Sequence, residues 1–212
     1  GDVARALGAA ATRLKATYEV PYLAHAPMEP LNATVRVSDG GCEIWTGTQV
    51  QGYVRGAAAA ALGVAPDKVS VTTTFLGGGF GRRSQTYYVT EAVHIARAVK
   101  APVKLVWTRE DDTRGGQYRP AMVALLEGGL DEAGWPVAWR QQIASPSILE
   151  QFGPLDGGID GAAVEGVANL PYAIPHLLVT YANPKLPVTT WFWRSVGSSH
   201  NAWAVEGFLD EL

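Results

Sequence analysis

The run Gly77-Gly78-Gly79-Phe80-Gly81-Arg82-Arg83 carries the clearest chemical signal in this chain of 212 residues. It follows a strand-like run, residues 69–75, and precedes a helix-like run, residues 85–99. Because glycine has no Cβ atom, such a loop permits positive φ angles and lets amide N–H groups approach a ligand closely. A loop that enters a helix N-terminus also favours an anion, and the two arginines add positive charge. The residues alone therefore predict either a loop that holds an anion or a tight turn that merely requires glycine.

This loop does not match the familiar phosphate-binding loops. A dinucleotide-binding loop needs Gly-x-Gly-x-x-Gly, and a P-loop needs a second glycine five residues after the first. Counted from Gly77, both patterns place their last glycine at residue 82, where the chain has Arg82. The loop is therefore not an ordinary nucleotide-binding loop.

Three further clusters combine polar side chains with loop residues. They are residues 25–30 (His-Ala-Pro-Met-Glu-Pro), residues 45–49 (Trp-Thr-Gly-Thr-Gln) and residues 193–200 (Trp-Arg-Ser-Val-Gly-Ser-Ser-His). Each cluster also has a purely structural interpretation, because Ser, Thr and Asn side chains commonly cap helices and polar side chains fix loops. The structural alternatives are a hydrogen-bonded loop at His25 and Glu29, and helix caps at Thr48, Gln49, Ser198 or Ser199.

Taken in order along the chain, these four motifs resemble the molybdenum-cofactor-binding subunit of the xanthine dehydrogenase and aldehyde oxidase family. The resemblance is strongest to its isoquinoline 1-oxidoreductase beta subunits and their membrane-associated aldehyde dehydrogenase relatives. It extends from Thr17 to Leu212 and is most specific at residues 25–32, 48–49, 77–83 and 193–197. It implies the molybdenum-cofactor-binding fold of the aldehyde oxidase type.

The resemblance also implies roles for individual residues. Gln49 would hydrogen-bond an oxo ligand of molybdenum, and Arg194 would help to place the substrate near the metal. A neutral amide suits the first role, because it can donate a hydrogen bond without becoming a metal ligand. The further candidates for contact with the cofactor are Gly78, Gly79, Phe80, Gly81 and Arg82. The dithiolene of molybdopterin, with a cytosine dinucleotide as one candidate form of the cofactor, would hold the molybdenum without any protein ligand.

Two departures from the family pattern concern the substrate. Purine-oxidising relatives carry an acidic residue where this chain has Ser84, and a stacking aromatic residue where it has Val196. The resemblance therefore favours an aromatic N-heterocycle or an aldehyde over a purine. The general-base glutamate of the family matches no residue in this chain, since Glu206 and Glu211 are expected to be solvated or to lie at the edge of the core.

The resemblance further implies a bacterial hydroxylase that inserts oxygen from water. Its electrons would leave through [2Fe-2S] centres on an iron–sulfur small subunit, with a cytochrome c subunit as a further candidate partner. The single cysteine, Cys42, cannot hold such a cluster. The bacterial cytoplasm and the periplasmic face of the inner membrane are both compatible locations. The chain lacks an initiator methionine, and we expect a fragment of a longer protein that is inactive alone.

Composition excludes several other classes. With 47% hydrophobic and 17% charged residues, the chain has a globular composition. A net charge of −3 argues against a general nucleic-acid surface. No apolar run reaches the roughly 18 residues that a membrane span needs.

The elements that must position these motifs predict an α+β fold with mixed sheets. Residues 33–37 and 42–46 are expected to form a hairpin around the turn at residues 38–41, and a βαβαβ pattern of short elements continues to residue 107. Residues 121–130 and 135–143 are expected to form a second hairpin. A helix over residues 3–10 capped by Asp2, a strand over 12–22, a strand over 177–181 and a final helix from His200 complete the pattern. Residues 144–176 show little periodicity, and such a long loop is usually functional. We expect two subdomains, residues 1–110 and residues 111–212.

Two other functions remain open from the residues. One is a non-catalytic α+β module that binds an anion or a partner protein. The other is a hydrolase built on Ser199 and His200, or on His25 with Glu29, although no Gly-x-Ser-x-Gly motif supports it.

Overall fold

The computed structural model describes residues 1–212, which form two compact units. One unit contains residues 24–117, and the other combines residues 1–23 with residues 118–212. This division differs from the expected one at residues 110 and 111. Residues 1–23 group with the second half of the chain because strand β1 (Thr12–Val20) pairs along its whole length with strand β6 (Met122–Leu130).

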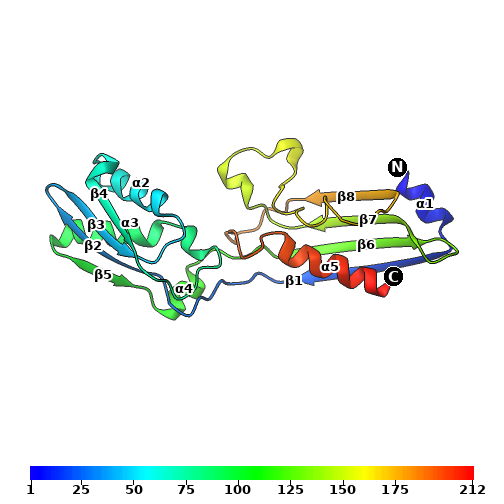
Figure 1. Ribbon diagram of the computed structural model, residues 1–212, viewed down its shortest axis with the longest axis horizontal. Coiled ribbons are helices and arrows are strands. Elements are labelled where there is room, and N and C mark those ends of the chain that lie inside the picture. Colours follow the sequence, from blue (N-terminus) through cyan, green and yellow to red (C-terminus); the bar gives the residue numbers. More distant parts are fainter. The chain divides into compact units, whose positions relative to one another are not determined.

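The unit of residues 24–117 is a four-stranded sheet with two main helices (Figure 1). Its strands lie in the order β4-β3-β2-β5, where β2 is Asn32–Ser38, β3 is Gly41–Thr46, β4 is Val69–Thr73 and β5 is Val103–Val106. Helix α2 (Gln51–Leu62) connects the parallel strands β3 and β4, and helix α3 (Tyr87–Val99) connects β4 to β5. Short 3-10 turns follow α2 at Pro66–Lys68 and precede α3 at Arg82–Ser84.

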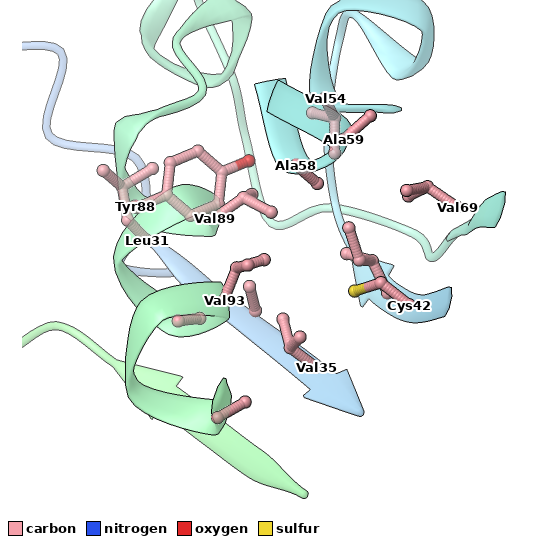
Figure 2. Close-up of a cluster of buried hydrophobic side chains, with 14 residues drawn as sticks. Leu31, Val35, Cys42, Val54, Ala58, Ala59, Val69, Tyr88, Val89 and Val93 are labelled. Carbon is pink, nitrogen blue, oxygen red and sulfur yellow. The ribbon is translucent and has the colours of Figure 1, made fainter. Parts of the chain in front are cut away.

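The core of this unit lies between the sheet and these helices (Figure 2). Strand alternation places Val35 and Ile44 on the buried face. Helix α3 buries Tyr88, Val89 and Val93 at helical spacing on the same core. Cys42 is part of this cluster, and burial raises the pKa of its thiol to about 11, so it stays protonated and unreactive.

The second unit is a sheet in the order β1-β6-β7-β8, where β7 is Pro136–Ala144 and β8 is His176–Ala182. Its helices are α1 (Val3–Ala9), capped by Asp2 as expected, and α5 (Ser198–Glu211). A Cβ at Gly128 would touch Phe208 of α5, whereas a Cβ at the next residue, Gly129, would touch Leu7 of α1. Because successive residues of a strand face opposite sides, the two helices cover opposite faces of the sheet.

The long segment of residues 145–175 is explained by the sheet topology. Strands β7 and β8 are parallel neighbours, and parallel strands need a crossover connection of a dozen residues or more. Here the connection contains two short 3-10 turns, Leu149–Phe152 and Asp156–Gly158, in place of a helix. We call residues 145–175 the crossover segment.

The α+β class and the order of the main elements are confirmed. In the expected βαβαβ section only β3–α2–β4 forms a parallel unit, since β5 pairs antiparallel with β2. Helix α4 (Arg109–Arg114) was not predicted. None of the helices combines the length and the apolar character needed to cross a membrane.

Candidate functional site

The glycine loop, residues 77–83, needs its glycines at specific positions. Gly78 and Gly81 have φ angles of 103° and 99°, which side-chain-bearing residues rarely adopt. Phe80 between them also has a positive φ of 54°, and its side chain is 41% exposed. An aromatic residue held in this region stores conformational strain, and such strain is often found at functional sites.

Gln49 is fixed against this loop by two hydrogen bonds. Its backbone N–H donates to the carbonyl of Arg83 at 3.0 Å, and its side-chain Oε1 accepts from the N–H of Gly81 at 3.1 Å. A backbone N–H can only donate, so the amide oxygen must face Gly81, and the Nε2 donors face away. A Cβ at Gly79 would lie 2.6 Å from Oε1, so glycine at that position makes room for the amide. Gln49 is an exposed residue, which leaves its Nε2 donors available to a ligand.

Glu29 anchors the start of the glycine loop. Its carboxylate accepts from the N–H of Gly77 at 2.7 Å and from Nδ2 of Asn32 at 2.8 Å, and it pairs with Nη2 of Arg83 at 3.0 Å. Its own N–H donates to the carbonyl of Gly77 at 3.1 Å. Burial alone would raise the pKa of Glu29, but these hydrogen bonds and the charge of Arg83 outweigh it and hold the pKa below its usual value. The loop-fixing interpretation of Glu29 therefore agrees with the structure.

Arg83 is fully buried, and its guanidinium binds backbone carbonyls. It donates to the carbonyls of Gly78, Gly47, Glu29 and Pro30 at 3.0 to 3.1 Å. These contacts join the glycine loop to the segments that carry Gln49 and Glu29. The side chain therefore holds the site together from within.

Arg82 is also buried, with 2% of its surface exposed. It pairs with the buried carboxylate of Asp112 at 3.1 Å, and its guanidinium lies 5.2 Å from the ring of Tyr87 and 5.7 Å from that of Trp107. The sequence suggested that Arg82 contacts the cofactor and that both arginines attract an anion. Both guanidiniums are buried and bonded within the protein, where they stabilise the loop.

The Arg194 segment, residues 193–197, is carried by the other unit. Arg194 is exposed, and the next two residues, Ser195 and Val196, have positive φ angles of 67° and 46°. A β-branched residue such as valine is rarely found in this region. Helix α5 follows directly, and Gly197 stands at its N-cap without a side-chain cap bond.

Backbone strain coincides with the sequence motifs. Five residues other than glycine have positive φ angles: Ala26, Phe80, Lys100, Ser195 and Val196. Lys100 is the ordinary C-cap of α3, and the other four all fall within the clusters selected by sequence. This coincidence favours a functional interpretation of the clusters over a purely structural one.

The helix-cap alternatives are wrong. Helix α2 has Val50 at its N-cap without a side-chain bond, and Thr48 Oγ1 instead accepts from the N–H of Val50. Ser199 donates to the carbonyl of Val196, outside the capping pattern.

The structure also contains no Ser–His pair of the kind that a hydrolase needs. The hydroxyl of Ser199 is bonded to a carbonyl, and neither ring nitrogen of the buried His200 has a hydrogen-bond partner. Burial, together with the nearby charge of Arg119, lowers the pKa of His200 to about 4. The carboxylate of Glu29 is bonded to the glycine loop rather than to His25.

The fold described above is that of a cofactor-binding domain. The model of the molybdopterin cofactor-binding domain family matches residues 1–212, and this chain belongs to that family. The resemblance inferred from the motifs is thereby confirmed.

Curated relatives agree with this assignment. The beta subunit of isoquinoline 1-oxidoreductase from Brevundimonas diminuta is 32% identical over 194 residues, which cover 88% of this chain and 25% of that protein. The molybdenum-binding subunit of an aldehyde oxidoreductase from Escherichia coli (strain K12) is 32% identical over 219 residues, which cover 100% of this chain and 28% of that protein. The chain thus spans about a quarter of the length of these relatives.

Solved structures show the same fold. Quinoline 2-oxidoreductase from Pseudomonas putida 86 superposes with a TM-score of 0.75 at 17% identity, over 92% of this chain and 25% of that one. The aldehyde oxidoreductase of Desulfovibrio gigas gives a TM-score of 0.73 at 19% identity, over 100% of this chain and 24% of that one.

Proposed function

We propose that the protein containing this domain binds molybdopterin and oxidises an aromatic N-heterocycle or an aldehyde, with oxygen derived from water. The observation that carries the proposal is the fixed amide of Gln49. Its oxygen is occupied by Gly81, which leaves two Nε2 donors for an oxo group of the cofactor. Arg194 is the second residue to which we assign a direct role: from its exposed segment it would contact and position the substrate.

The residues present fit a molybdopterin group. Gly79 is buried, and its N–H and that of Phe80 donate to no acceptor within the chain. Orphaned backbone donors in a glycine loop suit the oxygen atoms of a pyranopterin and its phosphate. Gly78 and Gly81 keep the loop backbone close to such a ligand, and the role we assign to Arg82 is to position the loop. When bound, the group would supply the redox centre for oxidation at carbon.

The proposed substrate class is supported by two uncharged residues, Ser84 and Val196. Ser84 donates its hydroxyl to the carbonyl of Gly81 at 2.6 Å and brings no negative charge to the loop. Val196 places no aromatic ring at the position where purine-oxidising relatives carry their stacking residue. Relatives named for isoquinoline, nicotinate and aldehyde substrates support an N-heterocycle or an aldehyde.

We further propose that electrons leave through [2Fe-2S] centres on a small partner subunit, with a cytochrome c subunit as the next acceptor. The lone Cys42 is buried in the core and cannot contribute to a cluster. A cytosine dinucleotide is the proposed form of the pterin. This domain alone should be inactive, because the general-base glutamate expected for the family has no counterpart in it.

Elemental analysis of the full-length parent, co-expressed with its small subunit, tests this function. We expect about one molybdenum atom per parent chain, and a lower molybdenum content or activity in Gln49→Ala. Gly56→Ala is the matched control, since a Cβ at that helical position meets no atom within 4 Å. A folded and assembled parent without molybdenum would overturn the proposal and favour a non-catalytic anion- or partner-binding module.

A further inference from the structure

The Arg194 segment is held at both of its ends by the crossover segment. Before it, the hydroxyl of Thr190 donates to the carbonyl of Ser147 at 2.9 Å. After it, Nδ2 of the fully buried Asn201 donates to the carbonyls of Ala163 and Glu165, each at 2.8 Å. The backbones are so close here that a Cβ at Gly197 would lie 2.0 Å from the carbonyl oxygen of Ala162.

Asp160 joins the two parts of the crossover segment that make these contacts. Its carboxylate is fully buried and has no basic partner among its hydrogen bonds. One oxygen accepts from the hydroxyl of Ser147 and from the N–H groups of Ile148 and Leu149. The other accepts from the N–H groups of Ala162 and Ala163.

Four backbone N–H groups and one hydroxyl thus satisfy the buried carboxylate, which offsets the cost of burying its charge. The carboxylate also ties residues 147–149 to residues 162–163. The first group holds Thr190 and the second lies against Gly197 and Asn201. Asp160 thereby fixes the distance between the two ends of the Arg194 segment.

We propose that Asp160, through Asn201 and Thr190, is a positioning residue for Arg194, and that the crossover segment serves to hold residues 193–197 in their strained conformation. Ser195 and Val196 both require positive φ angles, which the chain would leave if either end were released. The inference rests on the proposed function for Arg194, whereas the support itself is a property of this unit alone.

Hydrogen exchange tests the support without any activity measurement. The N–H of Val196 donates to the carbonyl of Trp193 at 2.7 Å, so its exchange reports the conformation of the segment. We expect Asn201→Ala and Thr190→Val to speed exchange in residues 193–199 by about tenfold, the effect of losing one or two buried hydrogen bonds. Exchange of the glycine loop should stay unchanged. Asp160→Asn should act in the same way if it folds, and the other two variants decide the question if it does not.

Tyr172→Phe is the matched control. It also removes a hydrogen bond between the crossover segment and α5, but to Glu206, away from Arg194. Faster exchange throughout the sheet, or unchanged exchange at Val196 in Asn201→Ala and Thr190→Val, would overturn the proposal.

A double-mutant comparison in the molybdenum-loaded parent then separates this inference from the proposed function. If Asn201 acts through Arg194, the loss of kcat/KM in Asn201→Ala should disappear in an Arg194→Ala background. Losses that multiply would show that Asn201 acts elsewhere and would overturn the positioning role. An Arg194→Ala variant with normal kcat/KM would instead contradict the proposed role of Arg194 in catalysis. The exchange data would still decide whether the crossover segment holds residues 193–197 in place.

Discussion

Replacing Gly79 by alanine tests whether the glycine loop fixes the amide of Gln49. The new Cβ would lie 2.6 Å from Oε1 and 2.9 Å from Cδ of Gln49, well inside contact distance. The φ angle of Gly79 lies outside the left-handed region, so alanine creates no backbone strain. The atoms that must move are therefore those of the flexible Gln49 side chain.

The expected change in the free energy of unfolding of Gly79→Ala follows from one lost hydrogen bond and from the lower conformational entropy of the unfolded chain. Displacing the Gln49 amide breaks its hydrogen bond with Gly81, with a loss of about 1 kcal/mol in the free energy of unfolding. Replacing glycine by alanine also restricts the unfolded chain and returns about 0.5 kcal/mol. Gly79→Ala should therefore lower stability by only about 0.5 kcal/mol, although it redirects the donors that we assign to the cofactor.

The sign of this change should reverse in a second background. In Gln49→Ala the obstructing side chain is gone, so Gly79→Ala should raise stability by about 0.5 kcal/mol. The coupling between the two residues is then about 1 kcal/mol, which urea unfolding of the four proteins can resolve. Gly56→Ala is the control, because alanine in the open interior of α2 should stabilise by about 0.5–1 kcal/mol in both backgrounds.

Equal effects of Gly79→Ala in the two backgrounds would refute the reasoning. The amide of Gln49 would then not occupy the space that glycine leaves, and its orientation would not depend on the loop. In the parent, Gly79→Ala should lower the molybdenum content or activity far more than its small effect on stability would explain.

Three further perturbations test the groups around the site. Glu29 has a lowered pKa in the folded protein, so its contribution to stability is present above its unfolded pKa, near 4.5, and is lost as pH falls through the lower folded value. Glu29→Gln should flatten the pH dependence of urea unfolding below pH ~5, and an unchanged slope would contradict the anchoring role. Asp112→Asn leaves the buried Arg82 without its charged partner and should destabilise the protein by about 3 kcal/mol in thermal or urea unfolding; a loss below about 1 kcal/mol would argue against the pairing. His200 is neutral when folded, with a pKa of about 4 against 6.5 when unfolded, so its contribution is complete above pH 6.5 and is lost as pH falls towards 4. His200→Gln should remove up to about 3 kcal/mol of this acid sensitivity, and an unchanged acid transition would contradict its burial.

The order of elements could be predicted because its signals are local. The alternation in β2 and β3, the turn between them and the glycine that ends α2 each lie within a few residues. Helix α4 also had such a signal, because Thr108 is followed three residues later by Asp111. The hydroxyl of Thr108 accepts from the N–H of Asp111 and so caps the N-terminus of α4. That signal was missed because α4 has only 6 residues and no apolar stripe.

The division into units could not be predicted in the same way. Whether β1 pairs with the strands that follow it or with β6, a hundred residues later, depends on contacts that no local pattern records. The parallel pairing of β7 and β8 is likewise non-local, and it turns an apparently structureless run into a required crossover.

Charge in the sequence proved a poor guide to exposure in the site. Arg82 and Arg83 follow a glycine run, and a sequence shows their charge but not their burial. Burial of Arg82 depends on Asp112, thirty residues later, and that of Arg83 on carbonyls near Gly47 and Glu29. A guanidinium with five donors can be satisfied by backbone carbonyls whose residue types carry no signal at all.

The glycine loop and the Arg194 segment are stabilised in the same way. In the glycine loop, strained Phe80 lies between ends held by Glu29 and Arg83. In the Arg194 segment, strained residues lie between ends held through Asp160 and Asn201. Strained backbone persists only where its surroundings determine it fully, so each segment needs buried polar groups supplied by distant parts of the chain.

This arrangement explains why sequence analysis finds the residues proposed to face a ligand but misses the residues that hold them in place. The residues proposed to face a ligand form compact motifs, because their chemistry depends on neighbours along the chain. The residues that hold them act on backbone N–H and carbonyl groups, so neither their own spacing nor the types of their partners forms a pattern. Substitutions of the holding residues should accordingly change the geometry of the site while leaving every motif residue in place, and exchange at Val196 is the direct measure of that effect.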